Sequence, residues 1–155
     1  MLVMSRAQLK QVVDAVEAAY PRECCGLLAG RSGPDSDIEV RAVHPSANLD
    51  RSGRADRFEV DSKLFIDLSR DLRGTEERVV GVYHSHCDHR AQPSETDLEL
   101  AWDPDLVWLI VAVEDGQAVH STAHALDAGG RQFHDTGLRT DDWTAYPVRS
   151  DEENS

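Results

Sequence analysis

The feature of the sequence that most limits its possible folds is an unbroken apolar run, Leu106–Val113, between Asp105 and Glu114. It is far shorter than the roughly 18 residues that mark a candidate membrane helix, and no other apolar run in the chain approaches that length. We therefore expect no transmembrane helix. A strand that is apolar on both sides has to be covered on both sides. The run predicts a central strand in a sheet with other elements on both faces.

Three segments have the pattern of helices. The first, Ser5–Tyr20, begins with a capping box, keeps apolar residues at helical spacing and stops before a proline. The second, Asp61–Arg73, has an apolar face and ends before a glycine, a common helix terminator. The third, Ser94–Trp102, is short and begins with a capping residue.

The remaining apolar segments predict strands. Besides the central run, we expect strands over 24–29, 38–42, 58–60, 78–86, 119–126 and 133–138, with loops over 44–57 and 87–93. This mixture predicts an α/β fold, a mixed β-sheet flanked by helices. The length suits a single domain. We place it over 1–140, followed by an acidic, flexible C-terminal tail over 141–155.

The charge of the chain limits its partners. There are 29 Asp and Glu residues against 16 Lys and Arg, a net charge of -13. Such a surface repels nucleic acid and anionic membranes, so we expect neither as a partner. The N-terminus lacks the basic and apolar regions of a secretory signal, which predicts a cytoplasmic protein. An acidic composition with only two lysines also fits a high-salt environment; stability that rises toward molar KCl would support this hypothesis.

The three cysteines do not predict disulfides. Cys24 and Cys25 are adjacent, Cys87 is distant, and an odd number without a signal peptide argues against a disulfide framework. We expect reduced thiols. A cysteine-protease role for Cys25 is possible, but no nucleophile signature flanks it.

A group of polar residues follows the strand predicted over 78–86. Because side chains two apart in a strand share a face, His84 and His86 present two imidazoles together. Asp97 lies one turn into the helix that begins at Ser94 and can return to the same point. Two imidazoles and one carboxylate leave a fourth position of Zn²⁺ open for water, the layout of a catalytic zinc. The alternatives are surface polarity for the histidines and an ordinary capping box for Ser94 and Asp97.

A zinc hydrolase also needs a proton carrier. Glu23 directly precedes the apolar strand predicted over 24–29 and is our candidate general base. The alternative is a solvated carboxylate at the end of a strand. Cys87 and His89 follow the metal strand and could compete as ligands. The other four histidines are expected to be ordinary polar or structural residues: His44, His120, His124 and His134.

Together these motifs resemble the JAMM (MPN+) metalloprotease signature, a Glu followed by His-x-His, seven residues, Ser, two residues and Asp. The segments that carry the resemblance are 21–28 with Glu23, 80–86 with His84 and His86, and 93–97 with Ser94 and Asp97. The resemblance spans about 21–110. It implies a cytidine-deaminase-like MPN fold, zinc bound by His84, His86 and Asp97, Glu23 as general base, and Ser94 as a donor to the oxyanion or the water.

Stand-alone prokaryotic members of this family are proteases. The resemblance therefore implies a zinc-dependent peptidase or isopeptidase that cleaves at the C-terminal tail of a ubiquitin-like or sulfur-carrier protein. One alternative is a catalytically silent MPN scaffold, although the chain keeps every metal residue that such scaffolds commonly lack. A zinc deaminase is disfavoured because the chain has no Cys-x-x-Cys. The specific substrate, the oligomeric state and the metal used in the cell stay open.

Overall fold

The computed structural model describes residues 1–52, 57–88, 91–94, 97, 103, 105–127, 129 and 132–141. The elements in these ranges are, in chain order, β1 (Leu2–Ser5), α1 (Arg6–Ala19), β2 (Cys25–Ser32), the short 3-10 helix η1 (Pro34–Ser36), β3 (Ile38–Ser46), α2 (Ser62–Leu72), β4 (Arg78–Cys87), β5 (Val107–Glu114), β6 (Gln117–Leu126), β7 (Phe133–Asp135) and β8 (Leu138–Asp141). None of these helices is long and apolar enough to cross a membrane. Most of the helix predicted over 94–102, and the predicted tail beyond Asp141, lie outside the described residues.

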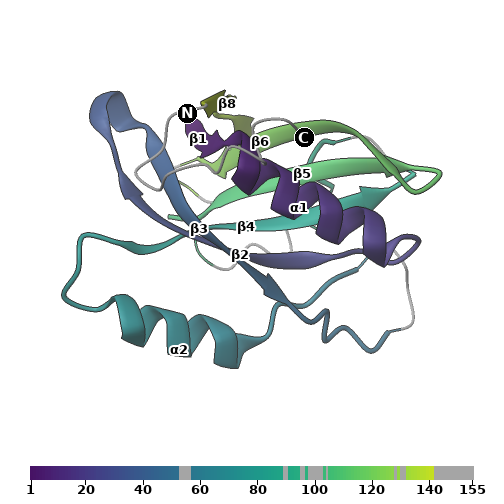
Figure 1. The fold of residues 1–155 in the computed structure, drawn as a ribbon, viewed down its shortest axis with the longest axis horizontal. Helices are drawn as coiled ribbons and strands as arrows, with labels where there is room; N and C mark the ends of the chain where they lie inside the picture. Colours follow the sequence, from purple (N-terminus) through teal and green to yellow (C-terminus); the bar gives the residue numbers. More distant parts are fainter. Residues whose placement is uncertain are drawn as a thin grey trace.

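The strands form one sheet in the order β7-β6-β5-β4-β2-β3-β1-β8 (Figure 1). Three neighbouring pairs are parallel, β4–β5, β1–β3 and β1–β8, and the other four are antiparallel. The predicted mixed sheet is therefore confirmed. The apolar run forms β5, which β4 and β6 pair on both sides, and its residues 107–113 are buried.

The sheet is strongly curled, so that its two edges meet. β7 and β8 stand at opposite ends of the strand order, yet only Thr136 and Gly137 separate them in the chain. Thr136 donates its N–H to the carbonyl of Ala123 in β6, and the carbonyl of Gly137 accepts the N–H of Leu2 in β1. Gly137 has a φ of +79°, which favours glycine. The single strand predicted over 133–138 is thus wrong, because the chain turns at Gly137 and changes edges.

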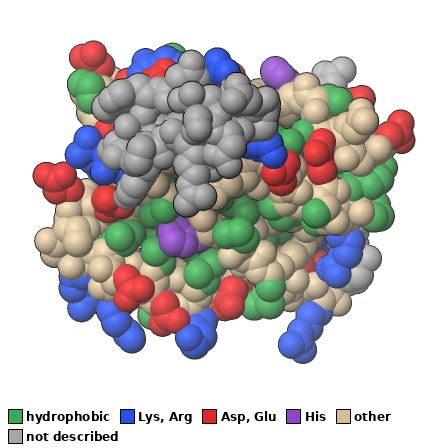
Figure 2. Space-filling view, viewed as in Figure 1, with side chains coloured by type: hydrophobic (Ala, Val, Ile, Leu, Met, Phe, Trp, Pro, Cys, Tyr) green, Lys and Arg blue, Asp and Glu red, His purple; other side chains and the backbone are tan. Residues whose placement is uncertain are grey.

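The two helices cover opposite faces of the sheet. Neighbouring side chains of β4 point to opposite faces: Tyr83 packs in the cluster that contains Val12 and Val16 of α1, whereas Val82 packs in the cluster that contains Leu68 of α2. Figure 2 shows the face that carries α1, with hydrophobic side chains across its middle and charged side chains of both signs around its rim. The histidine-bearing end of β4 therefore emerges from a sheet that is covered on both sides.

Local hydrogen bonds start both long helices where the sequence predicts. Ser5 Oγ accepts from the N–H of Gln8 (3.0 Å), and Gln8 Oε1 accepts from the N–H of Ser5 (2.9 Å). Asp61 caps α2 by accepting from the N–H of Lys63 (2.9 Å). The predicted capping box and both helix predictions are confirmed to within one residue at each end.

The strand predictions are less accurate. β3 continues to Ser46, so the loop predicted from His44 begins too early. The strand predicted over 58–60 forms only one isolated bridge, between Asn48 and Val60. β1 was not predicted at all. It exists because Leu2–Ser5 pairs with β3 and β8, whose residues are far away in the sequence.

Gly26 makes room for an aromatic ring beside the site. It lies opposite Tyr83 in the β2–β4 pair, and a Cβ built on it would come 2.2 Å from Tyr83 Cε2. Because Tyr83 is fully buried, we expect Gly26→Ala to lower the free energy of unfolding by about 1–3 kcal/mol, the cost of overpacking a core. Urea titration measures it. The control is Gly33→Ala, whose Cβ would meet only the side chain of Glu39 at 3.0 Å. Equal stability of the two variants would contradict the prediction.

Candidate metal centre

The end of β4 brings two imidazoles together inside the protein. His84 and His86 share one face of the strand, and His84 is fully buried whereas His86 is 6% exposed. Their Nε2 atoms are 3.1 Å apart. On the neighbouring strand β5, their register partners are Ile110 and Ala112, both buried, so the imidazoles lie against an apolar floor.

Asp97, eleven residues after His86, completes this group. Its Oδ1 lies 3.0 Å from His84 Nε2 and its Oδ2 lies 2.9 Å from His86 Nε2. Ser94 sets its position: the N–H of Ser94 donates to Asp97 Oδ2 (2.9 Å), and the N–H of Asp97 donates to Ser94 Oγ (3.1 Å). These reciprocal bonds are those of a capping box.

Hydrogen bonds alone do not account for these contacts. An imidazole nitrogen carries at most one hydrogen, yet His84 Nε2 lies within 3.1 Å of both His86 Nε2 and Asp97 Oδ1. If both imidazoles donate to Asp97 through Nε2, their mutual contact of 3.1 Å has a donor on each side and no acceptor. A cation that accepts lone pairs from all three groups removes this conflict, so the donor set suits a metal ion.

Glu23 approaches the same point from the entrance to β2. It is 4% exposed, and one of its carboxylate oxygens lies within 4.8 Å of ring nitrogens of both His84 and His86. The β2–β4 register explains this approach, because it pairs Cys25 with His84 and so carries Glu23 toward His86. The structure therefore brings Glu23, His84, His86 and Asp97 into one buried group.

The charges in this group favour metal-binding forms. Burial lowers the pKa of His84, although the neighbouring Asp97 opposes this effect. Burial would raise the pKa of Asp97, but its bonds to His84 and His86 outweigh burial and hold that pKa well below its ordinary value. A neutral imidazole beside an ionised carboxylate is the state in which such side chains bind metals.

Two aromatic residues that the sequence did not single out hold His84 in place. The ring of Phe58 stacks on the His84 imidazole with centroids 4.4 Å apart and planes 20° apart. Trp108 packs edge-on at 5.3 Å. Trp108 belongs to the apolar run and has the pattern of an ordinary core residue, and Phe58 lies outside the motif. The local sequence therefore does not predict that either one contacts His84.

Asn48 ties the loop that carries Phe58 to the segment that carries Glu23. Its Nδ2 donates to the carbonyls of Glu23 (3.0 Å) and Arg57 (3.1 Å). Its Oδ1 accepts from the N–H groups of Asp50 and Glu59, both at 3.0 Å. One amide therefore connects three backbone segments around the site.

A second tether holds the loop between His86 and Ser94. Thr122 Oγ1 of β6 donates to the carbonyl of Ala91, and His124 Nε2 lies 2.8 Å from the same hydroxyl. Ala91 packs on Ile110 and Ala112, the floor of the site. His124, expected to be structural, thus takes part in positioning this loop.

The described cysteines are free thiols. Burial, together with the neighbouring Cys24, raises the pKa of Cys25 to about 12, so its reactive thiolate is scarce and a nucleophilic role is disfavoured. Burial also raises the pKa of Cys24 and of Cys87. The group of potential ligands found in the described chain contains no cysteine. His89 lies outside the described residues.

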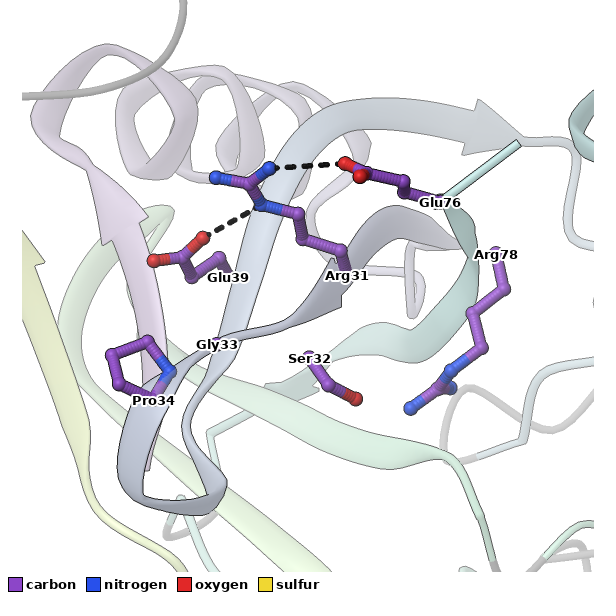
Figure 3. A pocket seen from close by; sticks show the side chains of 7 residues that line it. All are labelled: Arg31, Ser32, Gly33, Pro34, Glu39, Glu76 and Arg78. Atoms are coloured by element: carbon purple, nitrogen blue, oxygen red, sulfur yellow. Dashed lines mark hydrogen bonds and ion pairs between the residues drawn. The ribbon is translucent and has the colours of Figure 1, made fainter.

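A hollow of about 480 Å³ lies at the end of β4 opposite the histidines, and most of its lining residues are charged or polar. Arg31 lies between Glu39 and Glu76, at 3.0 and 3.3 Å, and Arg78 points into the hollow (Figure 3). Arg78 begins β4 eight residues before His86, which is roughly 26 Å along a strand. This hollow is therefore separate from the histidine group.

The Ser94 hydroxyl has two possible tasks, and one substitution separates them. Ser94 Oγ accepts from Asp97 but keeps its own hydrogen for donation. We expect Ser94→Ala to lower turnover by about 10²–10³-fold if the hydroxyl stabilises an oxyanion. Loss of the cap alone would cost about 1 kcal/mol of stability. Turnover, melting temperature and metal content are measured together. A lower melting temperature with unchanged turnover would contradict the catalytic role.

Comparison with known proteins gives a consistent set of relatives. Residues 5–125 match the family described as prokaryotic homologs of the JAB domain. The CysO-cysteine peptidase of Mycobacterium tuberculosis (strain H37Rv) is 33% identical over 114 residues, 74% of this chain and 75% of that protein. The desampylase of Haloferax volcanii is 35% identical over 101 residues, 64% of this chain and 69% of that protein.

Solved structures share the architecture. A protein from Desulfitobacterium hafniense superposes with a TM-score of 0.78 at 29% identity, over 94% of this chain and 96% of that one. A JAB1/MPN domain protein from Archaeoglobus fulgidus superposes with a TM-score of 0.57 at 20% identity, over 90% of this chain and 98% of that one. The second likeness concerns the fold alone and agrees with the MPN-type fold expected from the sequence.

Proposed function

Because the chain belongs to the prokaryotic JAB family, we propose that it is a zinc-dependent peptidase or isopeptidase that cleaves at the C-terminal tail of a ubiquitin-like or sulfur-carrier protein. The relatives named CysO-cysteine peptidase and desampylase support this proposal. The observation that carries it is the buried convergence of His84, His86 and Asp97 with Glu23 beside them. A scaffold that only binds partners would not need this set.

His84, His86 and Asp97 are the proposed ligands. Zinc is held at about 2.0–2.2 Å by nitrogen and oxygen donors in a tetrahedron, which puts neighbouring donors roughly 3.3 Å apart. The separations of 2.9–3.1 Å seen among these side chains come close to that value. When bound, zinc supplies Lewis-acid chemistry: it polarises the scissile carbonyl and makes a water acidic near neutral pH.

Glu23 is the proposed proton carrier. It takes a proton from the attacking water while the water oxygen bonds to the carbonyl carbon, and it passes that proton to the amine when the carbon–nitrogen bond breaks. Its shielding from solvent limits exchange of this proton. Asn48 donates to the Glu23 carbonyl at 3.0 Å and so helps to fix the backbone that carries this carboxylate.

Ser94 is the proposed donor to the oxyanion. Its side chain lies at the exposed mouth of the buried group, and it is bonded to Asp97 rather than enclosed. A hydroxyl placed there can donate to the carbonyl oxygen as negative charge develops.

The test uses intact carriers. The purified zinc form is incubated with a sulfur-carrier protein that bears a C-terminal cysteine after Gly-Gly, and with one linked to lysine through an isopeptide bond. Intact mass reports the products. Cleavage after the terminal glycine is the expected result. Cleavage of unfolded casein at scattered sites, with both carriers intact, would overturn the proposal in favour of a general peptidase, and binding without cleavage would favour a scaffold.

A further inference from the structure

A second hollow, of about 310 Å³, adjoins the metal centre on the α2 side of the sheet. We call it the side pocket. Five of its lining residues are apolar and two are polar: Leu49, Phe58, Val60, Val82 and Trp108, with Glu59 and Ser62. The volume is near the lower limit of ligand sites, about 300–1,000 Å³. It suits one or two side chains and is too small for a folded domain.

The side pocket and the metal centre share walls. Phe58 and Trp108 line the pocket and also contact the His84 ring, at 4.4 and 5.3 Å between centroids. Val82 forms the floor of the pocket and lies two residues before His84 on the same face of β4. Two residues of a strand span roughly 7 Å.

This spacing selects a position in the substrate. β4 is paired with β2 and β5 on its two sides, so an extended substrate chain would lie over the face that carries Val82 and His84, where it advances by about 3.3 Å per residue. When its scissile carbonyl is at His84 and His86, the side chain two residues away lies over Val82. An adduct with a single cysteine has only one residue beyond the scissile bond, so the side chain in the pocket comes from the carrier. In a tail that ends in Gly-Gly, it belongs to the residue just before the first glycine.

The edge of the side pocket carries one charge. Glu59 has an exposed side chain, and its backbone is fixed by the bond from its N–H to Asn48. A carboxylate at the rim of an apolar pocket favours a basic residue beside the apolar one, and this contributes more to selectivity than to affinity.

We propose that the side pocket is a specificity subsite for an aliphatic side chain immediately before Gly-Gly in the carrier tail, with a basic neighbour at Glu59. This inference rests on the proposed peptidase function. It extends that function by saying which carrier tails the protein selects, because a tail with Gly-Gly alone places no side chain over Val82 or Trp108.

Binding tests the subsite separately from catalysis. The zinc-loaded Glu23→Gln protein is titrated calorimetrically with two tail peptides, Arg-Leu-Gly-Gly-Cys and Arg-Ser-Gly-Gly-Cys. We expect the Leu peptide to bind about tenfold or more tightly, the factor that burial of one aliphatic side chain supplies. Leu49→Asp should abolish this preference. Its matched control is Ile66→Asp, since Ile66 is 54% exposed and Leu49 42% exposed, and Ile66 does not line the pocket.

A charge exchange tests the rim. Glu59→Lys should weaken binding of the Arg-Leu peptide and strengthen binding of a Glu-Leu peptide, with zinc content unchanged. Equal affinity of the Leu and Ser peptides, or equal loss of preference in Leu49→Asp and Ile66→Asp, would overturn the subsite. Carrier cleavage by the unmodified protein is measured separately. Absence of cleavage together with a Leu preference would refute the proposed peptidase function. Cleavage without a Leu preference would refute the subsite.

Discussion

Glu23→Gln is expected to leave the metal bound and to lower kcat by about 10²-fold or more, the usual contribution of general acid–base catalysis. Glutamine keeps the size and most of the hydrogen bonding of Glu23 but cannot take a proton at neutral pH. Asp97 contacts both histidines at 3.0 Å or less, and Glu23 lies in the same group; the proposal gives the ligand role to Asp97 and the proton to Glu23, and this variant tests that division.

The measurement pairs steady-state kinetics on a Gly-Gly carrier adduct with metal analysis of the same protein sample. Asp71→Asn serves as the control, because Asp71 is an exposed carboxylate near the end of α2 that belongs neither to the buried group nor to the side pocket. Near wild-type turnover in Glu23→Gln would refute the general-base role. Loss of metal in the same variant would instead make Glu23 a ligand.

The double substitution His84→Ala/His86→Ala is expected to abolish stoichiometric zinc binding, from about one ion per chain to near none, because it removes two of the three proposed protein ligands. Activity should fall with it. Metal analysis after dialysis measures the occupancy. A chelator should lower the melting temperature of the unmodified protein but not that of the variant, since a ligand that binds only the folded state stabilises it.

His120→Ala is the control for this prediction. His120 is exposed on β6 and does not belong to the buried group, so its loss should leave zinc content unchanged. Metal content in the double variant equal to that of the unmodified protein would show that the site has been assigned to the wrong residues.

Local patterns explain which parts of the site the sequence could predict. His84 and His86 share a face because they are two apart in a strand, and the Ser94–Asp97 capping box is a four-residue motif whose bonds the structure contains. Its position before a predicted strand makes Glu23 a candidate proton carrier, but that spacing does not fix its placement beside the histidines. That placement depends on β2 pairing with β4, and the sequence alone does not set that register.

The residues around the site were not predictable for the same reason. Phe58 stacks on His84 from a segment whose position depends on Asn48, and Asn48 looks like an ordinary loop residue until its four bonds are seen. In the fold, the mixed sheet and the two long helices follow from composition and periodicity. β1 was missed because its pairing partners are 36 and 136 residues away, as in Leu2 with Ile38 and Leu138.

The meeting of the two sheet edges has a consequence for synthesis. β1 is translated long before its partner β8, which lies 136 residues further along the chain, so the edge of β1 that β8 covers stays open until translation has passed Leu138. Open strand edges invite pairing with other chains, and contacts of long sequence separation slow folding. Nascent chains that stall before Leu138 should therefore be the ones that aggregate or recruit chaperones, whereas chains that include β8 can cover this edge of β1.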